Sequence, residues 1–266
     1  MPSSRDRFPE LYQTLLVPLI FEPYTADLAS RVAEFRPSNV LEVAAGTGAA
    51  TRAMARVLPT KAKLVATDLN QPMLDRAATV GTDRPVEWRQ ADALHLPFGD
   101  ATFDVVVCQF GVMFFPDVAW AFAEARRVLR PGGALLFSVW DRIEENEFAQ
   151  AVTEALAQIF PSDPPRFLER TPHGYHDPKV ISRDLLAAGF GTLPHIATLA
   201  ARSRAAAPTV PAIAYCQGTP VRTEIVERSS AGLAEATEVC AAAISRRFGA
   251  GAVDGKIQAH LVSIQA

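Results

Sequence analysis

The feature of the sequence that most constrains the fold is an alternation of short apolar segments with helix-like segments, which begins at Asn39. Such alternation is typical of a parallel sheet covered by helices on both faces, and a mixed α+β fold is the weaker alternative. Arg130-Pro131-Gly132-Gly133 is expected to turn the chain into the fifth strand. The expected strands are Val40–Val43, Leu64–Thr67, Val86–Arg89, Val105–Cys108 and Leu135–Val139, and the expected helices are Ala49–Leu58, Pro72–Val80 and Ala119–Leu129.

The segments outside this series follow a looser pattern. Asp177-Pro178 is typical of an N-cap followed by proline at the first helical position, which predicts a helix over 178–188. We expect the whole chain, 1–266, to form one domain. Its expected parts are a core at about 36–142, variable segments at about 1–35, 143–190 and 202–255, a helix at Glu147–Phe160, strands at Ile196–Ala201 and Ile257–Ile264, and an alanine-rich helical region at about 211–248.

Charge and cysteine content narrow the range of partners and compartments. The net charge is −3 and the pI is about 6.0, so no overall positive field would attract a nucleic acid. The three cysteines are far apart and lack metal-ligand spacing, which favours a reducing compartment. The sequence has neither a signal-peptide pattern nor an apolar run long enough to span a membrane. We therefore predict a cytoplasmic protein that binds neither nucleic acid nor membrane.

Glycine spacing marks the turn after the first expected strand. Gly46 and Gly48 fall in LEVAAGTGAAT (41–51), between a strand and a helix. Ligands of open parallel sheets bind beyond the carboxyl ends of the strands, where glycine lets the backbone approach them closely. A tight turn with no ligand is an equally good interpretation of the glycines alone.

Two acids strengthen the interpretation as a nucleoside site. Asp68 ends the second strand about 20 residues beyond the glycine turn, where a carboxylate can accept hydrogen bonds from a ribose diol. Its alternative role is a helix N-cap, but Asn70 is better placed for that. Asp92 follows the third strand, near the expected adenine, and a solvated loop acid is the alternative interpretation there.

The type of nucleotide follows from Thr51 and Glu42. A dinucleotide-binding turn has a third glycine at the position of Thr51. Glu42 ends the first strand, and its negative charge would repel a pyrophosphate but would tolerate a positively charged sulfonium cofactor. The residues therefore favour a sulfonium cofactor over a dinucleotide.

These residues resemble class I S-adenosylmethionine-dependent methyltransferases, over about residues 38–142. The closest group in character includes quinone-biosynthesis C-methyltransferases. The resemblance implies a Rossmann-like α/β fold, with a doubly wound, seven-stranded, mostly parallel sheet, a final antiparallel strand and a helical cap or insertion. The segments that carry it are VLEVAAGTG (40–48), LVATDLNQPML (64–74), RQADALHLPFGDATFDVVVCQF (89–110) and RRVLRPGGALLFSVW (126–140).

The resemblance also implies a cofactor, S-adenosyl-L-methionine, and the residues that contact it. Glu42 would lie near its aminoacyl end, and Asp68 would hold the ribose hydroxyls. Ala44 departs from the family, which often has glycine there, so the turn must accommodate its methyl group. The complete implied set is Glu42, Ala44, Gly46 and Gly48 at the first turn, Asp68, Leu69 and Met73 along the adenosine, Ala91, Asp92 and Ala93 at the adenine, and Gln109 and Phe110 beside the methionine part.

Candidates for a general base are His173 and His176, in the segment His173-Gly174-Tyr175-His176-Asp177. An imidazole can accept a proton from an acceptor molecule at neutral pH. The alternative is that both histidines are solvated and that Asp177 is only the helix cap. The pair lacks a third metal ligand, so we predict no metal site.

The sequence predicts an S-adenosylmethionine-dependent methyltransferase acting on a small molecule. The alternatives are a nicotinamide-dependent oxidoreductase and a non-catalytic module that keeps the cofactor fold. Region 211–248 is expected to contribute substrate selectivity or a homodimer contact. The aromatic residues expected near an acceptor pocket or a lid, with core packing as the alternative, are Phe110, Phe114, Phe115, Trp140, Tyr12, Phe21 and Tyr24.

Overall fold

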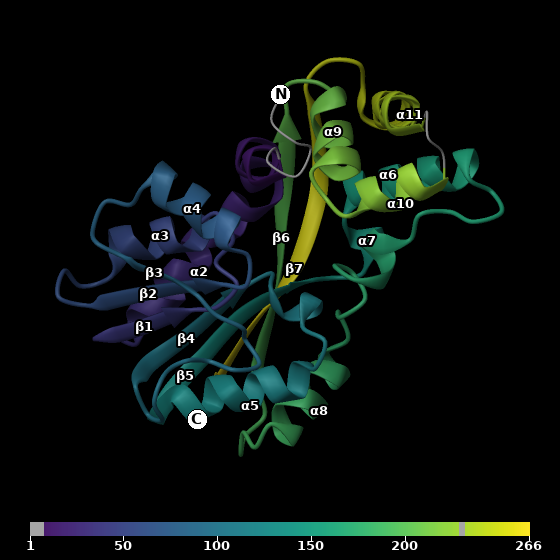
Figure 1. The fold of residues 1–266 in the computed structure, drawn as a ribbon. Helices are drawn as coiled ribbons and strands as arrows, with labels where there is room; N and C mark the ends of the chain where they lie inside the picture. The colour runs from purple at the N-terminus through teal and green to yellow at the C-terminus, as the bar shows by residue number, and fades with distance from the viewer. Residues whose placement is uncertain (1–7, 229–231) are drawn as a thin grey trace. The chain divides into compact units, whose positions relative to one another are not determined.

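A computed structural model describes residues 8–228 and 232–266, in which seven strands form one sheet (Figure 1). The strands are β1 (Asn39–Glu42), β2 (Lys63–Asp68), β3 (Glu87–Gln90), β4 (Phe103–Gln109), β5 (Leu129–Trp140), β6 (His195–Ala205) and β7 (Val253–Gln265). Their order in the sheet is β3-β2-β1-β4-β5-β7-β6. Strand β1 pairs in parallel with β2 and β4, β2 with β3, and β4 with β5, whereas β7 runs antiparallel to β5. The expected mostly parallel sheet with a final antiparallel strand is confirmed.

The helices cover the segments between the strands. Near the N-terminus they are α1 (Phe8–Leu11), the π-helix η1 (Tyr12–Phe21) and α2 (Glu22–Glu34). The crossover helices are α3 (Ala49–Val57), α4 (Gln71–Val80) and α5 (Val118–Val128), with the 3-10 turns η2 (Val112–Phe114) and η3 (Ile143–Glu145). The later helices are α6 (Glu147–Ile159), α7 (Phe167–Arg170), α8 (Pro178–Ala187), α9 (Thr209–Gln217), α10 (Val221–Arg228) and α11 (Gly232–Phe248).

One expectation about element boundaries is refined and another is corrected. The helical region expected at about 211–248, with its start blurred by Pro211 and Pro220, contains α9, α10 and α11, and Gly218-Thr219-Pro220 separates α9 from α10. Arg130–Gly133 does not precede strand β5 but lies within it, because Phe103 pairs with Leu129 and Val105 already pairs with Ala134. The four residues 130–133 bulge out of the β4–β5 ladder, and Gly132 takes the positive φ (78°) that this bulge requires.

The chain divides into two compact units. The sheet unit comprises Tyr24–Trp140, Tyr175–Leu199 and Ala259–Ala266. The helical unit comprises the described parts of Met1–Pro23, Asp141–Gly174 and Ala200–Gln258. The expectation of one methyltransferase domain over 1–266 stays a prediction. No helix in residues 8–228 and 232–266 is long and apolar enough to cross a membrane.

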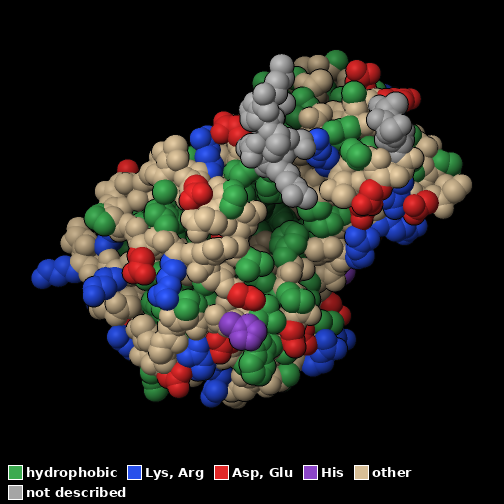
Figure 2. Space-filling model, viewed as in Figure 1, with side chains coloured by type: hydrophobic (Ala, Val, Ile, Leu, Met, Phe, Trp, Pro, Cys, Tyr) green, Lys and Arg blue, Asp and Glu red, His purple; other side chains and the backbone are tan. Residues whose placement is uncertain are grey.

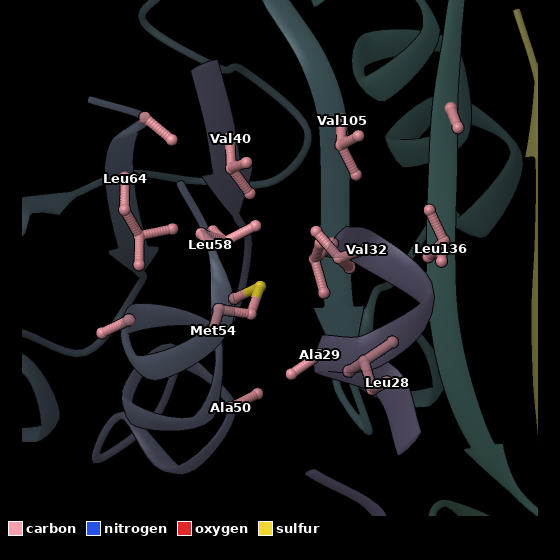
Figure 3. Packing of buried hydrophobic residues seen from close by; sticks show 14 of the residues in the cluster. Leu28, Ala29, Val32, Val40, Ala50, Met54, Leu58, Leu64, Val105 and Leu136 are labelled. Carbon is pink, nitrogen blue, oxygen red and sulfur yellow. The ribbon is translucent and has the colours of Figure 1, made fainter. Parts of the chain in front are cut away.

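The sheet unit has a hydrophobic core on each face of its parallel strands. On one face, α2 and α3 direct Leu28, Val32 and Met54 against Val40 of β1 and Leu136 of β5, as Figure 3 shows. Side chains alternate between the faces of a strand, so Val105 and Val107 of β4 belong to this cluster while Val106 and Cys108 point to the other face. There α5 packs with its Phe122 ring 5.0 Å from that of Phe137, and Figure 1 shows α5 and α8 on the face opposite α3.

The helical unit has a core of its own, in which α6, α9 and α11 pack together. Phe148 of α6 contacts Phe248 of α11 edge to face, with ring centroids 4.9 Å apart. Cys216 and Cys240 are both fully buried and remain free thiols, and the Cys240 Sγ lies 3.8 Å from the carbonyl oxygen of Val152.

Replacing Met54 tests the core beneath the first turn. Met54 is fully buried, so we expect Met54→Ala to lower the free energy of unfolding by about 2–5 kcal/mol through lost burial and a residual cavity. Val57 lies on the same helix but is 49% exposed, and Val57→Ala should change the stability by less than about 0.5 kcal/mol. Urea denaturation measures both variants, and equal effects would contradict the assignment of the buried face of α3.

Candidate functional site

Backbone strain gathers at the carboxyl ends of β1 and β4. Ala44 (φ 55°) and Phe110 (φ 54°) adopt the left-handed conformation that non-glycine residues rarely take, and Gly46 (φ 56°) and Gly48 (φ 83°) share it. A left-handed alanine or phenylalanine is disfavoured by about 1–2 kcal/mol. Such residues persist where the surrounding structure holds them, and they cluster at functional sites.

Main-chain hydrogen bonds fix the turn after β1 to both neighbouring strands. The Val43 N–H donates to the Val107 carbonyl of β4 and the Ala45 N–H donates to the Thr67 carbonyl of β2, both at 2.8 Å. The next residue, Gly46, donates its N–H to Oδ2 of Asp68, also at 2.8 Å. The glycine turn is therefore held rigidly at the edge of the sheet where ligands of this fold class bind.

Glu42 is a buried acid at the base of this turn. Its side chain is 1% exposed, and the Thr51 hydroxyl donates to its Oε2 at 2.5 Å. Burial raises the pKa of Glu42 from its ordinary value of 4.5 to about 8, while Thr51 and the charge of Arg52 act in the opposite direction. Thr51, which takes the third glycine position of a dinucleotide turn, is thus the hydrogen-bond partner of Glu42.

Asp68 joins the ends of β1 and β2. Its Oδ2 accepts the Gly46 N–H and its Oδ1 accepts the Asn70 N–H, each at 2.8 Å. Burial raises the pKa of Asp68, and the two backbone hydrogen bonds oppose that shift. Asn70 is the N-cap residue of α4, as expected, but its side chain makes no cap hydrogen bond. The carboxylate of Asp68 accepts the Asn70 N–H instead.

Gly48 is required by packing as well as by its conformation. It is the N-cap of α3, and a Cβ atom there would lie 2.8 Å from the indole ring of Trp88. Gly48 thus has a role in packing and in the turn itself, which agrees with the alternative that the glycines serve a tight turn. Close approach of a ligand to Gly46 and Gly48 stays a prediction.

Ala44 fits because Gly111 leaves room for it. A Cβ atom on Gly111 would lie 2.5 Å from the Ala44 Cβ and 2.7 Å from the Cys108 Sγ. Gly111 follows β4, so the methyl group of Ala44 takes the place that a side chain at 111 would need. The departure from glycine at position 44 is accommodated by a glycine 67 positions later in the chain.

The other expected cofactor residues lie around the same edge. Leu69 is 66% exposed, whereas Met73 is buried in α4. Asp92 accepts the Leu94 N–H at Oδ1 (2.9 Å), and its Oδ2 lies 3.9 Å from the Nδ1 of His95. Asp92 thus organises its own loop, Ala93 beside it is buried, and Ala91 donates its N–H to the Asp68 carbonyl.

Phe110 belongs to a buried aromatic cluster within the sheet unit. Its ring stacks on Trp140 at 3.9 Å with an interplanar angle of 10°, and Tyr24 meets both rings edge to face at 5.4 and 5.6 Å. The Tyr24 hydroxyl donates to the Leu199 carbonyl. These rings are core, so they do not form an open apolar lining, whereas Phe114 is 52% exposed. Gln109 ends β4 opposite Ser138 of β5.

The two histidines belong to different units. His173, in the helical unit, is buried, and its Nδ1 lies 2.7 Å from the Asp141 carbonyl oxygen. Because a carbonyl only accepts, Nδ1 carries the proton and Nε2 is the basic nitrogen of the neutral ring. His176, in the sheet unit, precedes Asp177, which caps α8 by accepting the Lys179 N–H. The cap role of Asp177 is confirmed, and a role for either histidine as a base stays a prediction.

Thr51, which is the hydrogen-bond partner of Glu42, and Gly111, which faces Ala44, contact expected site residues but were not identified from the sequence. The strand–turn–helix pattern could have pointed to Thr51, which faces back toward Glu42 from the first turn of α3. The contact between Ala44 and Gly111 joins two loops distant in sequence and left no local signal.

Basic and acidic side chains are interspersed on the face drawn in Figure 2. Within the part of the chain that the structure describes, no group of three or more His, Cys, Asp or Glu side chains is arranged to hold a metal ion.

Comparison with known proteins shows the family of this chain. Residues 41–137 match the family described as "Methyltransferase domain". A demethylmenaquinone methyltransferase of Clavibacter sepedonicus is 31% identical over 175 residues, which cover 62% of this chain and 70% of that protein. A ubiquinone/menaquinone biosynthesis C-methyltransferase of Saccharophagus degradans is 31% identical over 165 residues, or 57% of this chain and 66% of the relative. The chain spans only part of these relatives: its matched segments cover 66% of the Saccharophagus protein and between 44% and 47% of two further relatives.

Solved structures share the fold. A methyltransferase-like protein of Bacillus halodurans, described as putative, has a TM-score of 0.55 at 21% identity, and the YcgJ protein of Bacillus subtilis has 0.58 at 18%. Each comparison covers 91% of this chain and 97% of the other. The sheet order and the site thus define a Rossmann-like methyltransferase fold. The chain belongs to the class I S-adenosylmethionine-dependent methyltransferases.

The contact between Ala44 and Gly111 can be tested by paired substitutions. Gly111→Ala should lower the free energy of unfolding by about 1–3 kcal/mol, because the new methyl group overlaps Ala44 and Cys108. Adding Ala44→Gly removes one of these overlaps and should recover part of the loss. Thermal denaturation of the single and double variants measures the coupling, and strictly additive effects would contradict it.

Glu42 predicts a pH dependence of stability. Its pKa is higher in the folded protein (about 8) than its ordinary value of 4.5, so folding favours the protonated acid. The stability linked to this group is therefore complete below pH 4.5 and is lost as the pH rises through 8. Relative to Glu42→Gln, the free energy of unfolding of the wild type should fall by up to about 1.4 kcal/mol per pH unit across this window. Urea denaturation at several pH values measures it, and parallel curves for the two proteins would refute the assignment.

Proposed function

We propose that this protein transfers a methyl group from S-adenosyl-L-methionine to a small-molecule acceptor. The observation that carries the proposal is the buried carboxyl group of Glu42, 1% exposed, beneath a turn that Asp68 ties to β2. A pyrophosphate near Glu42 would add negative charge beside an acid that is already costly to ionise. A cationic cofactor would instead stabilise the ionised form of Glu42.

The residues around the turn fit such a cofactor. Each oxygen of Asp68 accepts one backbone N–H, and a carboxylate oxygen has a second lone pair that remains for a ribose hydroxyl. Glu42 would face the aminoacyl ammonium group. Exposed Leu69 offers an apolar surface to the adenosine. The remaining proposed contacts are Ala44, Gly46, Gly48, Met73, Ala91, Asp92, Ala93, Gln109 and Phe110.

For methyl transfer, the main contribution of the protein is to position the methyl donor and the acceptor. The bound cofactor supplies an electrophilic methyl group on a sulfonium centre. Holding donor and acceptor in line can contribute about 7–11 kcal/mol, whereas a general base adds about 3–5 kcal/mol. The rigid turn and strand ends would supply the first contribution. We extend the proposal to His173 or His176 as the proton acceptor, because an imidazole can accept a proton at neutral pH.

The acceptor class is proposed from the relatives and the charge. Relatives with 31% identity are named for methylation in menaquinone and ubiquinone biosynthesis, which supports a small, partly apolar acceptor. The three buried free thiols support a reducing, cytoplasmic setting. A homodimer contact through region 211–248 stays a prediction.

Ligand-induced thermal stabilisation tests the cofactor assignment. S-adenosylhomocysteine, the demethylated cofactor, at 100 times its dissociation constant should stabilise wild type by about 2.7 kcal/mol. Asp68→Ala should strongly reduce this shift, because both ribose hydroxyls lose their acceptor. His176→Ala is the control and should keep the full shift. Equal shifts in wild type and Asp68→Ala would remove Asp68 from the ribose site.

The same assay separates the alternatives. Stabilisation by NADH with no response to S-adenosylmethionine would favour an oxidoreductase. Cofactor binding without transfer of a labelled methyl group to any of a broad panel of quinols, phenols and amines would favour a non-catalytic module.

A further inference from the structure

The hydroxyl group of Thr47 is buried without a partner. Thr47 lies between Gly46 and Gly48, its side chain is 1% exposed, and its Oγ1 makes no hydrogen bond to any of the described residues. Leaving a buried hydroxyl unsatisfied destabilises a protein by about 1–3 kcal/mol, and a valine would fill nearly the same volume without that loss. Something other than stability therefore accounts for a hydroxyl group at this position.

The surroundings of Thr47 favour a negatively charged ligand. The adjacent Gly48 is the N-cap of α3 and has no side chain to satisfy the first N–H groups of that helix. A helix N-terminus carries a partial positive charge and attracts anions. Arg52 donates from Nη1 to the Thr47 carbonyl at 2.7 Å, which places a guanidinium group against the same turn. The unpartnered hydroxyl of Thr47 therefore lies beside both the N-terminus of α3 and the guanidinium group of Arg52.

We propose that Thr47 is a specificity-determining residue whose hydroxyl donates a hydrogen bond to the carboxylate of the cofactor's aminoacyl end. The inference rests on the proposed function. Within S-adenosylmethionine the carboxylate is the only anionic group, whereas the ammonium and sulfonium groups are cations. Glu42 lies five positions earlier at the base of the same turn and suits the ammonium. Thr47 and Glu42 together would fix the orientation of the aminoacyl end.

This role predicts that stability and affinity change in opposite directions. Thr47→Val removes the orphan hydroxyl, so the melting temperature of the ligand-free protein should stay the same or rise by a few degrees. The same change should weaken binding of S-adenosylhomocysteine about tenfold or more, because it removes a hydrogen bond to a charged group. Thr47→Ser keeps the donor and should bind within about threefold of wild type. If Thr47 had only a structural role, Thr47→Val would lower the melting temperature instead.

Calorimetric titration with two ligands distinguishes carboxylate recognition from a general distortion of the turn. S-adenosylhomocysteine contains the aminoacyl group, and 5′-methylthioadenosine has the same adenosine and thioether without it. Thr47→Val should lose affinity for the first ligand and bind the second as wild type does. Equal losses for both ligands, or no loss for the first, would overturn the role of Thr47.

The controls separate this inference from the proposed function. If wild type binds neither ligand, the proposed function fails and this inference fails with it. If wild type binds both ligands and Thr47→Val behaves identically, only the role of Thr47 fails. Thr47→Ala provides a second variant without the hydroxyl if Thr47→Val does not fold, and it should show the same ligand selectivity.

Discussion

The hydrogen bonds that fix the turn after β1 to β2 and β4 are the interaction on which the rest of the site depends. Val43 and Ala45 donate to the two neighbouring strands in succession, and Gly46 then donates to Asp68. These contacts hold a left-handed turn at the carboxyl edge of a buried parallel sheet. Because the strands beneath it are packed on both faces, the turn has little freedom to relax. A preorganised backbone of this kind lowers the entropy lost when a ligand binds.

Much of the fold could be predicted from the sequence, because the strand and helix patterns are set by residues close together in the chain. The strands alternate with helices at short range, and the expected segments lie within or close to the observed β1, β2, β3, β4 and β7. The separation of α9 from α10 at Gly218-Thr219-Pro220 was not resolved, because alanine-rich composition is helical on both sides of it. Residues 130–133 form a bulge within β5, which depends on pairing with β4 and is not encoded by the turn residues alone.

The position of Asp68 at the end of β2 was predictable, because the local strand–helix pattern fixes it, and its role toward a ribose stays a prediction. The candidate site was not predictable where contacts are long-range. The stacking of Phe110 on Trp140 joins two strands that are distant in the sequence, and the expectation that Phe110 lies beside the cofactor stays a prediction. Thr51 was noted only as a missing glycine, yet it is the partner of Glu42. Two buried groups, the Glu42 carboxyl and the Thr47 hydroxyl, lower the stability of the fold, which is common where binding and stability conflict.

The contact between Ala44 and Gly111 also constrains how such a sequence can evolve. With glycine at both positions, a methyl group can be added at 44 without meeting a side chain at 111, whereas one added at 111 would still overlap the Cys108 Sγ. Once alanine occupies 44, as here, position 111 can no longer accept a side chain without a steric overlap. Related chains should therefore show the two positions varying together, and a lineage that first gained a side chain at 111 would be expected to keep glycine at 44.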